Sequence, residues 1–227
     1  DINILSTEGR KKRLLIADMD STIINQECID ELAEFAGKRL EIEAITERAM
    51  RGELDFESAL KERVGMLRGL SENTLAETFE KRITITSGAE TLIRTMKAQG
   101  ATTALVSGGF TYFAGRVAAA VGFDRHRANR LIIEDAKLTG TVEEPILGRD
   151  AKLAALKEFC AANDVAPNDA LAVGDGANDL AMLGAAGLGV AFHAKPAVAA
   201  AAHAHVDHGD LTALLYLQGI PASEFAQ

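Results

Sequence analysis

The sequence predicts an α/β fold: a doubly wound parallel sheet with an inserted helical segment and a small β-hairpin. Three short, mainly apolar runs support this prediction, at residues 14–17, 101–106 and 170–173. Short continuous apolar runs are typical of strands buried on both faces, as in a parallel sheet. From residue 88 onward, helical patterns separate the runs, and alternation of strands with helices indicates parallel pairing.

Composition is that of a globular protein without membrane spans. The 227 residues are 48% hydrophobic and 25% charged, and no apolar run approaches the ~20 residues that a membrane helix needs. A net charge of −9 argues against a nucleic-acid partner, because nucleic acids bind to a basic face of a protein.

The two cysteines predict a reducing environment. Cys28 and Cys160 lie far apart in helix-like stretches, so we expect reduced thiols and a cytoplasmic location. Because the chain opens on Asp1 rather than Met, a further N-terminal domain is left open.

The region directly after the first strand changes to a helical pattern. We predict helices over 27–35, 41–50, 55–67 and 71–81. An all-helical insertion behind a strand that ends in acidic residues is interpreted as a cap over the strand ends. The predicted division is therefore a core formed by 1–23 and 84–227 and a cap formed by 24–83.

The remainder continues the α/β alternation. Helices are expected over 89–99, 110–121, 149–162, 178–186 and 211–217, with a fourth buried strand over 188–192. KLTG at 137–140 predicts the turn of a hairpin between 131–133 and 141–142.

Acidic and hydroxyl side chains follow the first strand. Asp18 and Asp20 come directly after the apolar run, and Ser21 and Thr22 follow them. Open α/β sheets bind ligands at the carboxyl ends of their strands. Two acids there have no core to fill, so they are interpreted as a nucleophile, a metal ligand or a proton carrier.

Three predicted strands end in residues suited to phosphate chemistry. Asp18, Ser107 and Asp175 occupy these ends, which favours one shared crevice. Asp18 and Asp175 would supply the hard oxygen ligands that Mg²⁺ prefers. Ser107 with the backbone N–H groups of Gly108 and Gly109, at a helix start, would bind phosphate oxygens.

Lys152, Asn178 and Asp179 each have two interpretations. Lys152 is either a solvated lysine in the first turn of its helix or the fixed cation that a phosphoryl site needs. Asn178 and Asp179 either cap the following helix, or Asp179 orients Lys152 and a metal-bound water.

Arg63 lies on an apolar helical stripe. Phe56, Leu60, Arg63 and Leu67 recur at helical spacing, so the guanidinium falls among apolar side chains. Such a placement is costly unless the charge meets an anion. The anion is either a cap glutamate in an internal salt bridge, or a substrate carboxylate or phosphate.

The motifs resemble those of a known superfamily. DMDST at 18–22, SGG at 107–109, Lys152 and GDGAND at 174–179 resemble the four ordered motifs of the haloacid dehalogenase superfamily, which has a Rossmann-like core. The predicted cap segment, with VSGGF, ANRL and KLTG, is similar to the phosphoserine phosphatase family within it. The resemblance covers nearly all of residues 13–217.

The resemblance implies an Mg²⁺-dependent hydrolysis of phosphoserine, the last step of serine biosynthesis. Asp18 would attack phosphorus and become an aspartyl-phosphate, and Asp20 would act as general acid and then base. Mg²⁺ would be held by Asp18, the main-chain carbonyl of Asp20, and Asp175. Ser107, Gly109 and Lys152 would bind the phosphoryl oxygens, supported by Asn178 and Asp179.

The same resemblance assigns the substrate contacts to the cap. Glu27 matches the residue that meets the substrate ammonium, and Arg63 the residue that meets its carboxylate. Met50 and Phe56 match residues that close over the ligand.

Three other functions remain open from sequence. The substrate could be another small phosphomonoester, such as phosphohomoserine or a sugar phosphate, although Glu27 and Arg63 argue against a sugar. A phosphotransferase that passes the group to an alcohol is a related variant. A phospho-acceptor signalling module also uses acids, a lysine and Mg²⁺, but needs neither Asp20 nor a cap. The histidines His193, His203, His205 and His208 have two interpretations: the His-x-His pair could bind a metal, or all four belong to a solvated alanine-rich segment, which is the interpretation we favour.

Overall fold

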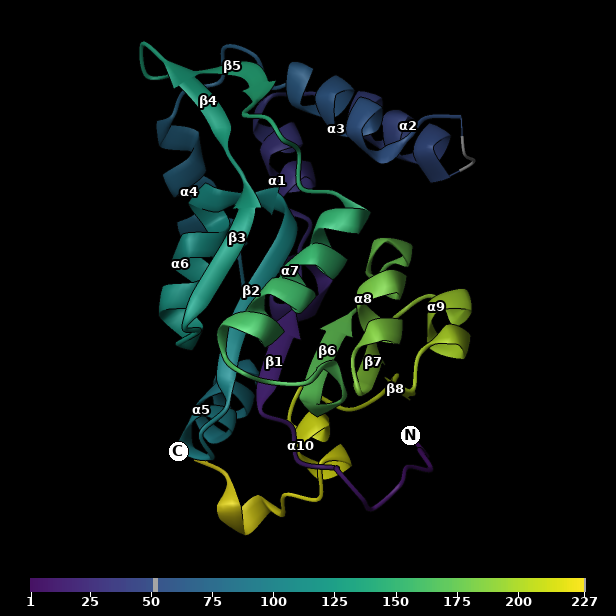
Figure 1. Cartoon of the computed structure of the whole chain (residues 1–227). Helices are drawn as coiled ribbons and strands as arrows, with labels where there is room; N and C mark the ends of the chain where they lie inside the picture. Colours follow the sequence, from purple (N-terminus) through teal and green to yellow (C-terminus); the bar gives the residue numbers. More distant parts are fainter. Residues whose placement is uncertain (51–52, 227) are drawn as a thin grey trace.

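A six-stranded parallel sheet forms the centre of the molecule (Figure 1). The structure is a computed structural model that describes residues 1–50 and 53–226, apart from the side chain of Met50. The strands are β1 (Leu14–Ala17), β2 (Thr102–Phe110), β3 (Arg125–Asn129), β6 (Ala170–Gly174), β7 (Leu188–Phe192) and β8 (Ala204–Val206). Their order, β3-β2-β1-β6-β7-β8, confirms the predicted doubly wound sheet and places β1 between β2 and β6.

Two apolar cores cover the two faces of the sheet. Side chains of β1 alternate between them: Leu15 and Ala17 belong to one core, Leu14 and Ile16 to the other, and all four are fully buried. The first core also takes in α5 (Ala89–Ala98), α6 (Thr111–Val121) and α10 (Ala213–Leu217). The second takes in α7 (Arg149–Ala162), α8 (Leu180–Ala185) and α9 (Pro196–Ala201). Burial on both faces explains why these strands are continuous apolar runs.

The segment between β1 and α5 is helical, as predicted. It contains α1 (Cys28–Phe35), α2 (Arg39–Met50), α3 (Phe56–Gly65) and α4 (Asn73–Arg82). The Asp55 carboxylate begins α3 by accepting a hydrogen bond from the Ser58 amide. Figure 1 shows these helices at the end of the sheet toward which the strands point, with both chain termini at the opposite end.

The hairpin β4 (Leu131–Glu134) and β5 (Lys137–Val142) is attached to this helical segment. Backbone hydrogen bonds join Gly69 N to Leu138 O at 2.8 Å and Leu138 N to Leu70 O at 2.9 Å. Lys61 of α3 pairs with Glu144 just beyond the hairpin at 2.6 Å. The hairpin and the four helices therefore form one continuous structure beyond the carboxyl ends of the strands.

Three details differ from the sequence prediction. The edge strands β3 and β8 were not predicted, because one face of an edge strand can remain solvated and leave no apolar run. Ser107, Gly108 and Gly109 lie in the extended end of β2, where the pairing register with β3 shifts, and α6 starts only at Thr111. The predicted helix 178–186 begins as a short 3₁₀ turn, Ala177–Asp179.

Among the described residues, no helix combines the length and the apolar character needed to cross a membrane.

Leu15→Ala should lower the free energy of unfolding by about 2–5 kcal/mol, because it opens a cavity in the core beside the central strand. Urea denaturation measures the change. Leu40→Ala is the matched control: Leu40 is 77% exposed, so its loss should stay within about 0.5 kcal/mol. Equal losses in the two variants would contradict the assigned core.

Candidate active site

The carboxyl ends of β1, β2 and β6 meet at one pocket of about 730 Å³. The predicted residues that line it are Asp18, Asp20, Glu27, Phe56, Arg63, Ser107, Gly108, Gly109, Asp175 and Asn178. The Asp18 amide donates to Val173 O at 2.9 Å, which fixes the end of β1 against the end of β6. The pocket thus brings residues from the sheet and from the helical segment to one place. Met50 was also predicted here, but its side chain lies outside the described residues.

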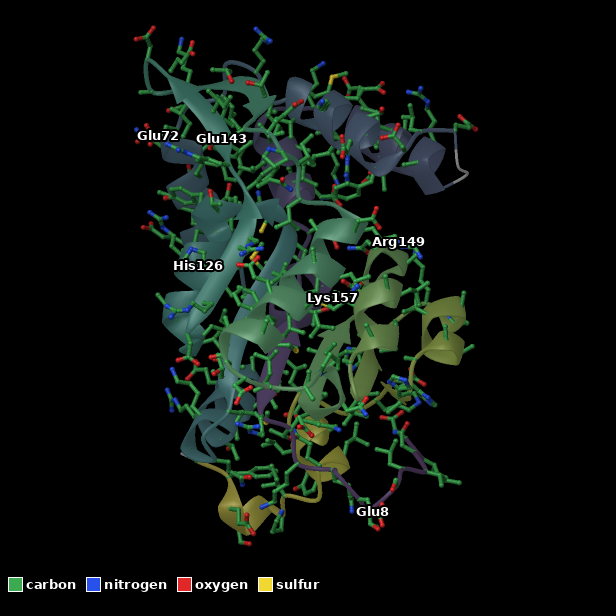
Figure 2. The ribbon with its side chains drawn as sticks, in the orientation of Figure 1. Glu8, Glu72, His126, Glu143, Arg149 and Lys157 are labelled. Atoms are coloured by element: carbon green, nitrogen blue, oxygen red, sulfur yellow. The ribbon has the colours of Figure 1, made fainter. Side chains whose placement is uncertain are left out.

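Lys152 lies beneath this pocket as a buried cation. It is 1% exposed, whereas Arg149 and Lys157 of the same helix lie on its exposed side (Figure 2). Its Nζ is 2.7 Å from Asp18 Oδ2 and 2.6 Å from Asp179 Oδ1. Burial by itself would lower the pKa of Lys152, but the two carboxylates outweigh it and raise that pKa. The solvated alternative for Lys152 is therefore wrong.

Asp18 is held on two sides. Its Oδ1 accepts a hydrogen bond from the Met19 amide at 2.7 Å, and its Oδ2 faces Lys152. Burial and the nearby carboxylate of Asp179 raise the pKa of Asp18, while Lys152 opposes the shift. The carboxylate is fixed in direction at the edge of the pocket.

Asp20 points into the same pocket from the turn that follows. Ser21 has a φ of 54°, in the left-handed region, and this bends the chain directly after Asp20. The Asp20 carboxylate accepts from the Cys28 amide at 3.0 Å and from Ser107 Oγ at 3.1 Å. Burial raises the pKa of Asp20, and these hydrogen bonds counter part of the rise. A carboxyl group that keeps its proton to a higher pH can deliver it to a leaving group.

The end of β2 contacts Asp20 closely. Ser107 Oγ accepts a hydrogen bond from the Gly109 amide at 2.8 Å while it donates to Asp20. A Cβ at Gly109 would lie 2.6 Å from Asp20 Oδ2, so only glycine fits beside this carboxylate.

Three carboxylates could hold a metal ion. Oxygens of Asp18, Asp175 and Asp179 all lie within 4.8 Å of one another. Burial and the carboxylate of Asp179 raise the pKa of Asp175 to about 6, while Lys152 opposes the shift. Hard oxygen ligands in this number suit a divalent cation such as Mg²⁺ or Mn²⁺.

The side chains of Asp20 and Asp179 occupy different places in this cluster. The Asp20 side chain lies outside the group of three, and the metal-binding role predicted for Asp20 uses its main-chain carbonyl. Asp179 accepts from Lys152 and also from the Gly176 amide at 3.1 Å, so both of its oxygens are engaged. Within the described ranges no hydrogen bond is formed by the half-buried Asn178 side chain, which faces the pocket.

Glu27 also lines the pocket. Its Oε1 accepts a hydrogen bond from Ser21 Oγ at 2.7 Å. The residue is exposed to solvent in the ligand-free pocket, but the protein around the carboxyl group desolvates it, and this desolvation, with Asp20 and Asp175 nearby, raises the pKa of Glu27 to about 8. A cationic ligand group would relieve this unfavourable environment.

Arg63 reaches the pocket from α3. Its Nε donates to Ala59 O at 3.3 Å and its guanidinium approaches Thr46 Oγ1 at 3.5 Å. In the part of the chain that the structure describes, no carboxylate lies within 4.0 Å of this guanidinium, so the internal salt bridge considered from sequence is not formed. Burial lowers the pKa of Arg63, and Asp30 is the first of the carboxylates that oppose the shift. The free side of the guanidinium is available to an anionic ligand.

Phe56 joins the helical segment to the core. A Cβ at Gly108 would lie 2.9 Å from Phe56 Cζ, and a Cβ at Gly148 would lie 3.0 Å from Phe56 Cδ1. The ring therefore rests directly over both glycines.

The sequence did not single out several residues at the site. Lys195, Ala197 and Val198, at the start of α9, also line the pocket. Asn129, at the end of β3, hydrogen-bonds to Gly108 O at 2.8 Å. Asn129 occurs in the ANRL motif, but nothing in the sequence pattern indicated its partner.

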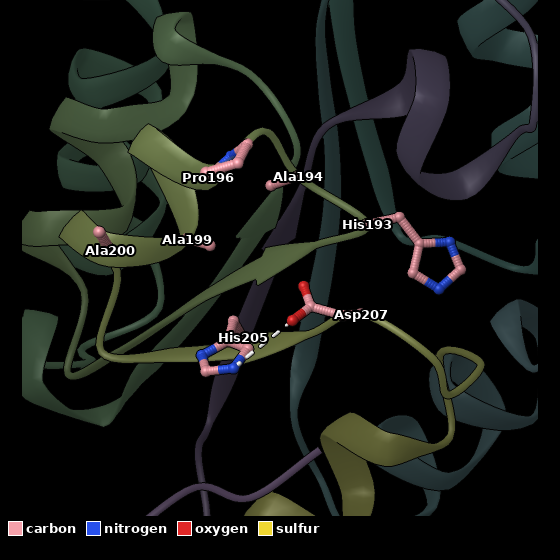
Figure 3. Close-up of a pocket in the computed structure, with 7 residues that line it drawn as sticks. All are labelled: His193, Ala194, Pro196, Ala199, Ala200, His205 and Asp207. Carbon is pink, nitrogen blue, oxygen red and sulfur yellow. Dashed lines mark ion pairs between the residues drawn. The ribbon is translucent and has the colours of Figure 1, made fainter.

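A second group of possible ligands lies on the surface (Figure 3). His205 Nε2 is 3.6 Å from Asp207 Oδ2, and Asp1 lies near both. The Asp1 carboxylate already accepts from the amides of Asp207, His208 and Gly209. The side chains of this group are exposed or half-buried, and His205 lies in the edge strand β8.

Comparison with known proteins assigns the family. The haloacid dehalogenase-like hydrolase family matches residues 15–184. A phosphoserine phosphatase of Albidiferax ferrireducens is 46% identical over 210 residues, which cover 90% of this chain and 89% of that protein. One from Haemophilus influenzae is 48% identical and covers 90% of this chain and 65% of that protein.

A solved structure of a phospho-aspartyl intermediate analogue of phosphoserine phosphatase superposes with a TM-score of 0.85. It is 41% identical, and the match covers 93% of this chain and 100% of that one. The chain belongs to the haloacid dehalogenase-like hydrolases and, within them, to the phosphoserine phosphatase family.

Glu27→Gln should stabilise the ligand-free protein in alkaline solution. The pKa of Glu27 is about 8 in the folded chain against 4.5 ordinarily, so the folded state favours the protonated group. That stabilisation is complete below the ordinary pKa and is lost as the pH rises through the folded value. The melting temperature of Glu27→Gln, relative to the native chain, should therefore increase from about pH 5 to about pH 9.

Thermal melts in EDTA at several pH values measure this difference. Glu8→Gln, at an exposed position, is the control and should follow the native curve throughout. A constant or reversed difference for Glu27→Gln would contradict the assigned environment.

Proposed function

We propose that the chain hydrolyses O-phospho-L-serine to L-serine and inorganic phosphate. The observation that carries this proposal is the placement of a guanidinium and a carboxyl group, Arg63 and Glu27, in the pocket that also contains Asp18, with no carboxylate of the described residues paired to Arg63. A free amino acid presents a carboxylate and an ammonium group, and these two side chains match that pair of charges. The relatives named above are phosphoserine phosphatases, which supports the same substrate.

Asp18 is the proposed nucleophile. Its carboxylate oxygen forms a bond to phosphorus while the bond from phosphorus to the serine oxygen breaks, which leaves an aspartyl-phosphate. Asp20 gives its proton to the departing serine oxygen. In the second half of the reaction, Asp20 takes a proton from the water that attacks phosphorus, and Asp18 and phosphate are released.

The phosphoryl oxygens need fixed donors. Lys152 has three N–H groups, of which Asp18 and Asp179 take two, and the third is proposed to meet a phosphoryl oxygen. Ser107 and the amides of Gly108 and Gly109 would supply further donors from the end of β2. This requires that the ligand replace the present acceptor of the Gly109 amide, Ser107 Oγ, and the present acceptor of the Ser107 hydroxyl, Asp20 Oδ2. Asn178 is proposed to donate from the other side of the pocket.

The acidic residues fit a divalent cation, and we propose Mg²⁺. Asp18, Asp175 and the main-chain carbonyl of Asp20 would hold it, with Asp179 fixing Lys152 beside them. When bound, such an ion offsets negative charge on the phosphoryl oxygens and on the carboxylates around it.

We further assign residues 24–83 as a cap domain over a core of 1–23 and 84–227. Phe56 rests over the core glycines, and Met50 is assigned to the same closing surface. A cap of this kind excludes bulk water while the aspartyl-phosphate forms. Both cysteines, Cys28 and Cys160, are buried free thiols, which fits the proposed cytoplasmic location.

Phosphate release from L-phosphoserine, measured with Mg²⁺ and after removal of metal with EDTA, tests the proposal. We expect turnover that requires Mg²⁺ and a kcat/KM that exceeds the value for p-nitrophenyl phosphate. No turnover of phosphoserine, or a preference for neutral phosphomonoesters, would overturn the substrate assignment.

Arg63→Ala should lower kcat/KM for phosphoserine by about 10²-fold, because the substrate carboxylate loses its charged partner in a largely desolvated pocket. Activity on p-nitrophenyl phosphate, which has no carboxylate, should change little. Arg39→Ala is the matched control, since Arg39 is exposed and pairs with Glu34 and Glu43 outside the pocket. An equal loss on both substrates would contradict the role of Arg63.

Asp20→Asn should lower kcat for phosphoserine by about 10²–10⁴-fold, because the leaving oxygen and the attacking water lose their proton carrier. With p-nitrophenyl phosphate, whose leaving group needs no proton, the variant should release one equivalent of nitrophenolate rapidly and then turn over slowly. Rapid-quench kinetics measure this burst. Unchanged turnover in both assays would show that Asp20 does not carry the proton.

A further inference from the structure

Asn129 is a buried amide whose partners are all backbone groups. It ends β3 and is 3% exposed. Its Nδ2 donates to Gly108 O at 2.8 Å and to Leu147 O at 3.2 Å, and its Oδ1 accepts from the Leu147 amide at 2.6 Å. Three hydrogen bonds satisfy a carboxamide well, so the side chain is held in one orientation.

The two segments that Asn129 joins both lead into the pocket. Gly108 lies between Ser107 and Gly109, whose side chain and amide form hydrogen bonds at the site. Leu147 directly precedes Gly148, the residue that caps α7, and the Lys152 amide donates to Gly148 O at 3.2 Å in the first turn of that helix. One side chain therefore connects the end of β2 to the helix that carries the buried cation.

Phe56 depends on the same two segments. Its ring rests over Gly108 and Gly148, on either side of the span that Asn129 bridges. A change in the separation of these segments would move the surface on which the helical segment closes.

We propose that Asn129 is a positioning residue of the phosphatase. It fixes Gly108 relative to Leu147, and thereby aligns the donors of the 107–109 segment with Lys152 around one phosphoryl group. Asn129 acts through these backbone groups, and the geometry gives it no contact with the reacting atoms. This inference rests on the proposed phosphatase function.

Two variants of the full chain separate positioning from stability. Asn129→Ala removes all three hydrogen bonds. Asn129→Asp keeps the shape and the acceptor for the Leu147 amide, but an ionised carboxylate then faces the carbonyls of Gly108 and Leu147. The Asp variant decides the question if the Ala variant does not fold.

Asn163→Ala is the matched control. Asn163 also donates through its amide to a backbone carbonyl, Phe159 O at 2.8 Å, but it lies at the far end of α7. For each variant we would measure the melting temperature, kcat and KM for phosphoserine and p-nitrophenyl phosphate, and inhibition by inorganic phosphate. All assays would be run well below the lowest melting temperature.

We expect kcat to fall by about tenfold or more on both substrates in each folded Asn129 variant, because small misplacements of catalytic donors are costly. The inhibition constant of inorganic phosphate should rise with it, while Asn163→Ala keeps kcat within about twofold. A smaller loss in a folded Asn129 variant, or an equal loss in Asn163→Ala, would overturn the inference.

Failure of the native chain to hydrolyse phosphoserine would instead contradict the proposed substrate. The assays with p-nitrophenyl phosphate and inorganic phosphate would still test Asn129 in that case.

Discussion

The carboxylates at the carboxyl ends of the strands depend on one buried ammonium group, that of Lys152. Lys152 lies within 2.7 Å of carboxylate oxygens of both Asp18 and Asp179, and it is almost fully buried. Breaking a buried pair of this kind typically costs about 3–5 kcal/mol, since the partner charge is left without compensation. Burial raises the pKa values of Asp18, Asp20 and Asp175, and the carboxylate of Asp179 adds to the rise for Asp18 and Asp175. A divalent cation and a phosphoryl group are the complementary ligands of such an arrangement.

The pocket divides into two halves with different tasks. The sheet supplies the acids and Lys152, which lie at strand ends and in the first turn of α7. The helical segment supplies Arg63 and Phe56. The hairpin that hydrogen-bonds to this segment begins at Leu131, two residues after Asn129. Under the proposed roles, chemistry and recognition can vary separately, because the proposed reacting groups lie on the core and the proposed substrate contacts lie on the helical segment. Asn129 lies where the two halves meet.

The fold could be predicted from the sequence because the central strands are buried on both faces. β1 and β6 were visible as continuous apolar runs, and the acids that follow them could be placed at a shared edge. β3 and β8 were missed because edge strands need no such run. Arg63 could be recognised from sequence as a charged residue on an apolar stripe, but only the folded pocket shows that none of the described carboxylates pairs with it.

Other features depended on contacts between distant segments. Whether Lys152 was solvated or buried could not be decided from its place in a helix, since Arg149 and Lys157 share that helix and are exposed. The link from Asn129 to Gly108 and Leu147 joins three segments across 18 to 21 residues, and no local pattern encodes it.

Trapping the covalent intermediate tests the central claim most directly. The native chain would be quenched in acid during turnover of ³²P-labelled phosphoserine, and the protein-bound acyl phosphate reduced with borohydride, which converts a phosphorylated aspartate to homoserine. Mass spectrometry should then find homoserine at position 18 alone. Label carried by a serine, threonine or histidine, or reduction at another aspartate, would contradict an account in which Asp18 attacks phosphorus beside Lys152.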